Sequence, residues 1–254
     1  MKLNQVQNYD EMSRQAASIL ISQVRQNPSS TLGLATGGTP LGIYACMVAD
    51  HRENATSYAQ VSTVNLDEYV GLKESDSQSY HFYMQRNLFS HIDIPRDATH
   101  IPNGMSPDLL AECRRYDDLL NSLNGVDIQL LGIGANGHIG FNEPGTSFQA
   151  RTHIVELTET TRAANGRYFP SLQDVPHKAI TMGIASIMES RHILLLASGT
   201  NKAEAVYALF CDEVSEQNPS SILKKHANVT VIADEAALIL AKQKGCVEHP
   251  RKTS

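Results

Sequence analysis

Two kinds of segment alternate along the chain, as judged by the spacing of their apolar residues. Seven short runs are apolar almost without interruption, which is typical of strands covered on both faces of a parallel sheet. These runs are residues 31–36, 61–66, 126–134, 153–157, 178–183, 192–197 and 228–233. Helix-like patterns fill the intervals at residues 10–26, 40–50, 107–123, 158–168 and 202–210. The alternation predicts a doubly wound α/β fold, with a mostly parallel sheet and helices on both faces.

Composition narrows the class of protein. The 254 residues are 41% hydrophobic and 19% charged, with a formal net charge of −6, which is ordinary for a globular protein. No basic stripe is present, so a nucleic-acid partner is not expected. No linker, repeat or low-complexity tract divides the chain, so we expect residues 1–254 to form a single domain.

The cysteines and the apolar runs bear on the compartment. Cys46, Cys113, Cys211 and Cys246 are scattered without paired spacing, so we expect reduced thiols. No apolar run reaches the length of a membrane span, and the first residues do not resemble a signal peptide. We therefore expect a cytoplasmic protein that is not inserted in a membrane.

The stretch GIGANGHIGFNEPG, residues 132–145, follows an apolar run and contains the pattern G-x-G-x-x-G. A dinucleotide-binding loop needs a helix that begins at the third glycine. Here Gly140, Pro144 and Gly145 interrupt the segment in which that helix would lie. The nucleotide interpretation is therefore disfavoured, and the glycines instead indicate a sharp turn that passes close to a small ligand.

The same loop carries side chains suited to acid–base chemistry. Asn136, His138, Asn142 and Glu143 lie within eight positions of one another. A histidine in a loop is, taken alone, as compatible with a surface role as with catalysis. A carboxylate five residues away favours proton transfer.

A second glycine-rich loop follows the first apolar run. Thr36, Gly37, Gly38 and Thr39 precede Pro40, which suits the first turn of a helix. We expect Thr39 to cap that helix and the backbone N–H groups of the glycines to bind an anion. A plain tight turn between strand and helix is the alternative.

Further candidates follow other strands. Asp67 and Glu68 come directly after residues 61–66, where adjacent acids either act in chemistry or only cap the chain. Lys202 lies in the first turn of a predicted helix, which is unfavourable for a cation unless it binds an anion there. Arg167 alone is typical of a solvated side chain. The histidines and cysteines show no metal-ligand spacing, and no serine-hydrolase elbow is present.

Taken together, these motifs resemble the glucosamine-6-phosphate deaminase family. The resemblance is carried, in family order, by LGLATGGTP, VNLDEYVGL, SYHFYMQRNLF, LLGIGANGHIGFNEPGTSF, TRAANGRYF, KAITMGI and SGTNKAEAV. It implies a modified Rossmann-like domain shared with 6-phosphogluconolactonases, and the FNEP ending of the loop is similar to the deaminases. It also implies the substrate glucosamine 6-phosphate, and neither cofactor nor metal.

The resemblance also implies roles for individual residues. Asp67 would move a proton between C2 and C1 of the sugar, and His138 would open the pyranose ring. Glu143 and Asn136 would orient the histidine. The 6-phosphate would be held by the loop Thr36, Gly37, Gly38 and Thr39, and by Arg167 and Lys202.

Two positions depart from part of the family. Asn136 stands where an aspartate is found in some members, so the negative charge beside the histidine is left to Glu143. His153 and Val155 stand where allosterically activated members have basic residues, so we expect no activation by N-acetylglucosamine 6-phosphate and a monomer or small homo-oligomer. A 6-phosphogluconolactonase-like hydrolase and a sugar-phosphate-sensing domain on the same fold are the alternatives.

Overall fold

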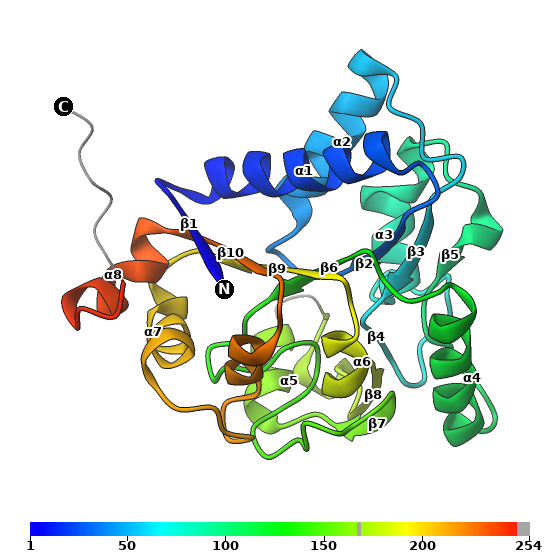
Figure 1. Ribbon diagram of the computed structural model, residues 1–254. Helices are drawn as coiled ribbons and strands as arrows, with labels where there is room; N and C mark the ends of the chain where they lie inside the picture. Colours follow the sequence, from blue (N-terminus) through cyan, green and yellow to red (C-terminus); the bar gives the residue numbers. More distant parts are fainter. Residues whose placement is uncertain (167–168, 248–254) are drawn as a thin grey trace.

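The large sheet of the computed structural model contains seven strands, all of them parallel (Figure 1). The structure describes residues 1–166 and 169–247. In their order across the sheet, the strands are β1 (Lys2–Val6), β10 (Val229–Asp234), β9 (His192–Ala197), β6 (Ile128–Gly132), β2 (Thr31–Leu34), β3 (Ser62–Asn65) and β5 (Thr99–His100). Because the strands are parallel, their carboxyl ends all lie at one edge of the sheet, where ligands of open α/β sheets bind.

A smaller antiparallel sheet lies beside that edge. Its strands are β4 (Asp67–Tyr69), β8 (Lys178–Thr181) and β7 (His153–Glu156), in that order. The chain passes from the large sheet into the small one at Leu66. The N–H of Leu66 donates to the carbonyl of Leu34 (3.2 Å), and its own carbonyl accepts from Met182 N–H (2.6 Å). Asp67 therefore stands where the two sheets meet.

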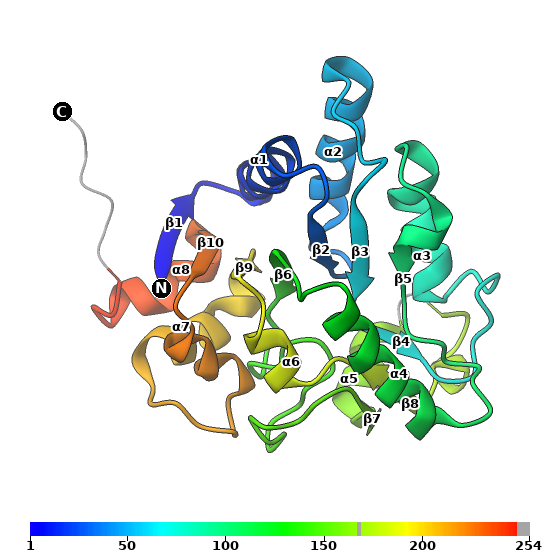
Figure 2. The same ribbon diagram turned by 45° about the vertical axis from the view of Figure 1, so that its right-hand side comes forward.

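Helices cover both faces of the large sheet (Figures 1 and 2). One apolar cluster packs α1, α2 and α3 against the sheet, and a second packs α4, α6, α7 and α8 on the opposite face. The helices are α1 (Tyr9–Gln26), α2 (Leu41–Asn54), α3 (Tyr80–Asn87), α4 (Leu109–Ser122), α5 (Glu159–Asn165), α6 (Ile184–Met188), α7 (Ala203–Cys211) and α8 (Glu235–Gln243). Short 3-10 turns are η1 (Phe89–His91), η2 (Arg96–Ala98), η4 (Leu172–Asp174), η5 (Thr200–Lys202) and η6 (Pro219–Lys225).

Strand β9 shows why the apolar runs are continuous. Its side chains alternate between the two faces, since successive residues of a strand point in opposite directions. Leu194 and Leu196 belong to the first cluster, whereas Ile193, Leu195 and Ala197 belong to the second. A strand covered on both sides needs apolar residues at every position.

The predicted fold class is confirmed. All seven predicted runs contain a strand, although the runs at 153–157 and 178–183 form β7 and β8 of the separate antiparallel sheet. The pattern missed β1, β4 and β5, which are polar at the sheet edge or only two or three residues long. It also missed α3, α6 and α8, which have five to nine residues each.

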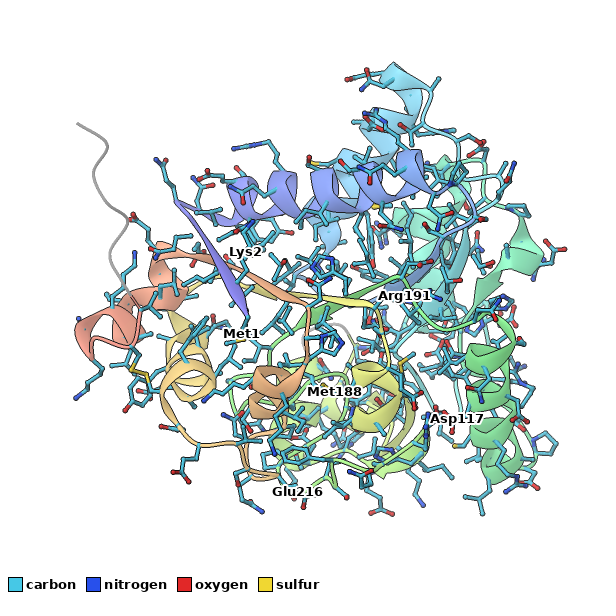
Figure 3. The ribbon with its side chains drawn as sticks, in the orientation of Figure 1. Met1, Lys2, Asp117, Met188, Arg191 and Glu216 are labelled. Carbon is cyan, nitrogen blue, oxygen red and sulfur yellow. A yellow bond between two sulfur atoms is a disulfide. The ribbon has the colours of Figure 1, made fainter. Side chains whose placement is uncertain are left out.

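The expectation of four reduced thiols is wrong for one pair. Cys211 and Cys246 form a disulfide, with Cα atoms 5.7 Å apart (Figure 3), whereas Cys46 and Cys113 are free. Cys211 is the last residue of α7, and Cys246 follows the end of α8. Because α7 and α8 pack side by side, the two cysteines meet although 35 positions separate them.

Within residues 1–166 and 169–247, no helix combines the length and apolar character needed to cross a bilayer.

Candidate active site

The predicted site loops follow neighbouring strands of the large sheet. Strands β9, β6, β2 and β3 are adjacent, and their carboxyl ends lead into residues 198–202, 133–145, 35–40 and Asp67, respectively. Two of these loops come close together. A Cβ atom added to Gly132 would lie 3.8 Å from Thr39 Oγ1.

Asp67 and the histidine loop converge on Thr181 of β8. Asp67 pairs with Thr181 across the small sheet, and Phe141 N–H donates to Thr181 Oγ1 (3.1 Å). A Cβ atom added to Gly140 would lie 3.7 Å from Asp67 Oδ2. Gly140 is two residues from His138, so the structure brings the carboxylate of Asp67 and the histidine loop to one place.

Glu143 is the centre of a polar cluster within the loop. Its side chain is almost fully buried. Asn136 Nδ2 donates to Glu143 Oε2 (2.7 Å), and the hydroxyl of Thr161 donates to Oε1. His138 Nδ1 lies 3.7 Å from the same Oε2, which is longer than a hydrogen bond. Catalytic contacts of this kind often shorten only when substrate binds.

Asn136 also shapes the turn before the histidine. Its side-chain oxygen accepts from the backbone N–H of His138 (3.2 Å). The imidazole lies against Gly134, where an added Cβ would be 2.3 Å from ring atoms. Any residue other than glycine at 134 would therefore displace the histidine.

Hydrogen bonds from residues just before and within η6 hold the histidine loop in place. Gly145 N–H donates to the carbonyl of Glu216 (2.8 Å), and Ser220 N–H donates to the carbonyl of Gly137 (2.9 Å). A Cβ on Gly137 would lie 2.2 Å from Asn218 Oδ1. No described helix begins between Gly137 and α5, so this loop lacks the helix that a dinucleotide site requires.

The two carboxylates have opposite electrostatic environments. Burial, and secondarily the negative charge of Glu68, raises the pKa of Asp67 to about 8. Burial would also raise the pKa of Glu143, but the imidazole of His138 and the hydrogen bonds from Thr161 and Asn136 together lower it to about 2. Asp67 can therefore accept and release a proton near neutral pH, whereas Glu143 stays ionised beside the histidine.

Two tyrosine hydroxyls fix the conformation of the loop after β2 by hydrogen bonds to its carbonyls. Gly37 has φ +83°, a conformation that favours glycine, and its carbonyl accepts from the Tyr83 hydroxyl (2.6 Å). The Tyr9 hydroxyl donates to the Gly38 carbonyl (3.1 Å) and accepts from Gly42 N–H (2.9 Å). With both carbonyls bound to tyrosines, the loop is fixed before any ligand arrives.

The prediction that Thr39 caps the helix is wrong. Helix α2 begins at Leu41, its N-cap is Pro40, and no side chain forms the usual cap hydrogen bond. Tyr9, about thirty residues earlier, satisfies the Gly42 N–H instead. The hydroxyl of Thr39 is thus not used by the helix.

The loop after β9 is positioned by Asp234, which caps α8. Asp234 accepts from the Ser198 hydroxyl (2.6 Å) and from Gly199 N–H (3.1 Å to each oxygen). Gly199 has φ +92°, and the turn η5 follows it and ends at Lys202. Lys202 is half-buried at the start of α7. Arg167 lies outside the described residues.

Sequence reasoning missed several residues of this site. Thr161 and Thr181 carried no signal, since each becomes relevant only through contacts with distant residues. Tyr80 and Tyr83 stood within the segment SYHFYMQRNLF but received no role. The Tyr80 hydroxyl forms side-chain hydrogen bonds with Tyr69 and Thr36. The first residue of α3 therefore contacts the loop after β2.

The described residues contain no group of three or more histidine, cysteine or acidic side chains arranged to hold a metal ion. The chemistry that this arrangement offers is proton transfer by a buried carboxylate and by an imidazole, next to a glycine loop suited to an anion.

The raised pKa of Asp67 predicts a dependence of stability on pH. A carboxylate whose folded pKa lies above its unfolded value costs stability as the pH rises from about 4 to about 8, because the unfolded chain ionises first. Asp67→Asn should therefore be more stable than wild type at pH 8, with a difference that shrinks to near zero at pH 4. Urea unfolding at several pH values measures this. A difference that does not vary with pH would show that the carboxylate is not destabilised by burial.

Comparison with known proteins agrees with this geometry. The sequence model of a family described as glucosamine-6-phosphate isomerases/6-phosphogluconolactonase matches residues 4–232. A glucosamine-6-phosphate deaminase of Geobacillus sp. (strain WCH70) is 62% identical over 94% of this chain and 96% of its own length. The deaminase of Shouchella clausii is 58% identical over 96% of this chain and 99% of its own.

Solved structures give the same result. A monomeric glucosamine-6-phosphate deaminase superposes with a TM-score of 0.93 at 53% identity, covering 94% of this chain and all of its own. The 6-phosphogluconolactonase of Trypanosoma brucei, at 19% identity, has a TM-score of 0.74 over 95% of this chain and 98% of its own, which shows a shared fold. The chain belongs to the glucosamine-6-phosphate isomerase/6-phosphogluconolactonase family.

Proposed function

We propose that this chain converts glucosamine 6-phosphate and water to fructose 6-phosphate and ammonia. Relatives more than half identical over nearly the whole length carry the name glucosamine-6-phosphate deaminase. The observation that carries the proposal is the buried Asp67, whose pKa of about 8 suits a proton shuttle, beside a histidine–carboxylate loop.

The first step is ring opening. His138 moves a proton between the anomeric hydroxyl and the ring oxygen, which requires a group able to accept and donate near neutral pH. Glu143, which is ionised and buried, stabilises the imidazolium that His138 forms transiently. Asn136 and Thr161 each hold one oxygen of that carboxylate, so its position does not depend on the substrate.

The second step is isomerisation. Ring opening produces an aldehyde at C1, which acidifies the hydrogen on C2. Asp67 takes that proton while the C1 oxygen gains one, which forms an enolamine. The proton then returns from Asp67 to C1 as the amino nitrogen gives one up. The product carries an imine at C2, to which water adds, and ammonia leaves as the C2 ketone forms. A carboxylate of ordinary pKa would be a much weaker base for the C2 hydrogen.

The phosphate binds away from the reacting carbons and supplies binding energy and register. We assign it to Thr36, Gly37, Gly38 and Thr39, together with Arg167 and Lys202. The fixed loop carbonyls and the unused Thr39 hydroxyl support this assignment. So does the place of Lys202, which is half-buried at the end of η5, directly after the loop that follows β9.

The comparisons and the fold also support proposals on domain organisation, compartment and oligomeric state. We assign residues 1–254 to one domain, because the family model spans residues 4–232 and the catalytic groups come from both sheets. We also propose a cytoplasmic enzyme that acts as a monomer or small homo-oligomer; a solved relative is a monomer. A sugar-phosphate sensor would need the phosphate loop but not the Asp67, His138 and Glu143 set.

The test of the function is a direct comparison of two reactions. Purified protein should release ammonia from glucosamine 6-phosphate and leave 6-phosphogluconolactone unhydrolysed above the spontaneous rate. Ammonia is followed with a coupled dehydrogenase and lactone opening by base uptake. Lactone hydrolysis without ammonia release would contradict the proposal, and the absence of both would favour the sensor.

Lys202→Ala should raise KM for glucosamine 6-phosphate by roughly tenfold to a hundredfold, since a charge-assisted hydrogen bond to phosphate is worth about 1.5–3 kcal/mol. The kcat value should change little, because the phosphate does not react. Lys244→Ala, an exposed lysine at the end of α8, is the matched control and should leave both constants unchanged. A fall in kcat alone would place Lys202 in the transition state instead.

His153 and Val155 lie on β7, where basic residues would be needed for the allosteric anion. The His153 ring contacts the Arg151 carbonyl (2.8 Å). N-acetylglucosamine 6-phosphate should therefore leave the dependence of rate on substrate hyperbolic and unchanged. Sigmoidal kinetics that become hyperbolic on its addition would refute this.

A further inference from the structure

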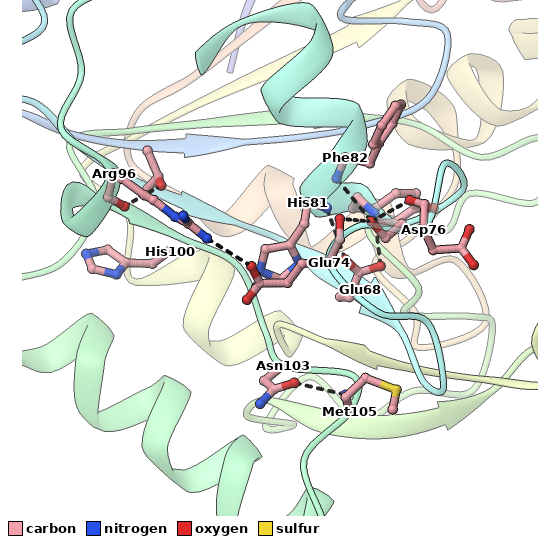
Figure 4. Close-up of polar contacts among 12 residues, drawn as sticks. Glu68, Glu74, Asp76, His81, Phe82, Arg96, His100, Asn103 and Met105 are labelled. Carbon is pink, nitrogen blue, oxygen red and sulfur yellow. Dashed lines mark hydrogen bonds and ion pairs between the residues drawn. The ribbon is translucent and has the colours of Figure 1, made fainter. Parts of the chain in front are cut away.

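Glu68 is the most completely hydrogen-bonded carboxylate near the site, and it is only 1% exposed. It follows Asp67 on β4 and so points to the other side of the strand. Its Oε1 accepts from the N–H groups of Tyr69 (2.8 Å) and Tyr80 (3.0 Å). Its Oε2 accepts from the N–H (3.1 Å) and the ring Nδ1 (2.8 Å) of His81, as Figure 4 shows.

These bonds fix β4 to the amino end of α3. A carboxylate at that end of a helix is favoured by the helix dipole and by unpaired N–H groups. Helix α3 also reaches the proposed phosphate loop, because Tyr83 donates to the Gly37 carbonyl and Tyr80 bonds to Thr36. Glu68 therefore sets the register between the strand that carries Asp67 and the loop assigned to the phosphate.

The charge of Glu68 also acts on Asp67. It adds to burial in raising the Asp67 pKa. Tyr80 of α3 and Tyr116 of α4 also interact electrostatically with Asp67. Burial raises the pKa of both phenols well above the usual value, so they remain neutral wherever the enzyme works. Among these groups, Glu68 is the one that carries charge.

His81 connects this buried carboxylate to solvent. Its ring is 21% exposed and lines a groove of about 870 Å³ together with Glu74 and Arg96. Its Nε2 lies 3.8 Å from Glu74, which in turn lies 3.5 Å from Arg96. Glu112 of α4 also interacts electrostatically with this ring. The ring that hydrogen-bonds Glu68 is thus accessible from solvent and has acidic neighbours.

We propose that Glu68 and His81 are positioning residues for Asp67. Glu68 holds the strand of the base against α3, and His81 determines how much of the Glu68 charge reaches Asp67. This inference rests on the proposed function, because it assigns roles in the proton transfer that Asp67 performs.

The experiment measures kcat/KM for ammonia release against pH, which reports the ionisations of free enzyme and substrate. The substrate is the same throughout, so differences between variants belong to the protein. Glu68→Gln removes a negative charge beside Asp67, and the acid limb should move to lower pH by about one unit.

His81→Leu should move the acid limb the opposite way, to higher pH by roughly half a unit. Three backbone N–H groups still hold the Glu68 carboxylate in place, but the ring no longer donates a hydrogen bond that offsets its charge. His81→Asn, whose amide can donate from a similar place, should restore the wild-type limb. Asp50→Asn is the matched control: it removes a hydrogen-bonded carboxylate from α2 and should leave the limb in place.

Variants that lose activity equally at every pH, with unmoved limbs, would overturn the inference and leave Glu68 as a structural cap. Should Glu68→Gln fail to fold, His81→Leu and His81→Asn test the same inference. The first should move the acid limb to higher pH, and the second should leave it at the wild-type position. A wild type that releases no ammonia would overturn the proposed function itself, whereas an active wild type with unmoved variants overturns only this inference.

Discussion

The proposed chemistry depends on the burial of one carboxylate, that of Asp67, at the boundary between two sheets. Asp67 is the first residue of the small sheet, one residue beyond the crossing at Leu66, and it pairs with Thr181. Hydrogen bonds on both sides of Leu66 fix that crossing. A carboxylate in such a place is a poor acid and a good base, and its cost in stability is offset by the surrounding fold.

The histidine loop supplies the complementary environment. Glu143 is also buried, but donors on both oxygens and a neighbouring imidazole keep it ionised. Two carboxylates of the same chemical type thus have pKa values separated by their surroundings, as the proposed division between a proton shuttle and a fixed charge requires. The glycines of the loop make this possible, because the imidazole occupies the space where a side chain at position 134 would lie.

Local patterns in the sequence were sufficient for the fold class and the loops. Continuous apolar runs and glycine clusters depend on neighbouring residues, so seven of the ten described strands and the two glycine-rich loops could be predicted. Contacts between distant residues could not. The hydroxyl of Thr161 on Glu143, the Cys211–Cys246 disulfide and the Tyr9 hydroxyl that replaces a Thr39 cap each join segments far apart in the chain. The residue pattern alone did not distinguish the adjacent acids at 67 and 68. The resemblance singled out Asp67, and the fold places the Glu68 carboxylate at the amino end of α3.

The central claim is that Asp67 moves a proton between C2 and C1 of a sugar whose ring His138 has opened. The most direct measurement is hydrogen exchange at C2 of glucosamine 6-phosphate in D2O, followed by NMR, in wild type and Asp67→Asn. The account predicts exchange in wild type and its loss in the variant, with the affinity for substrate nearly unchanged. Exchange at the wild-type rate in Asp67→Asn would contradict it.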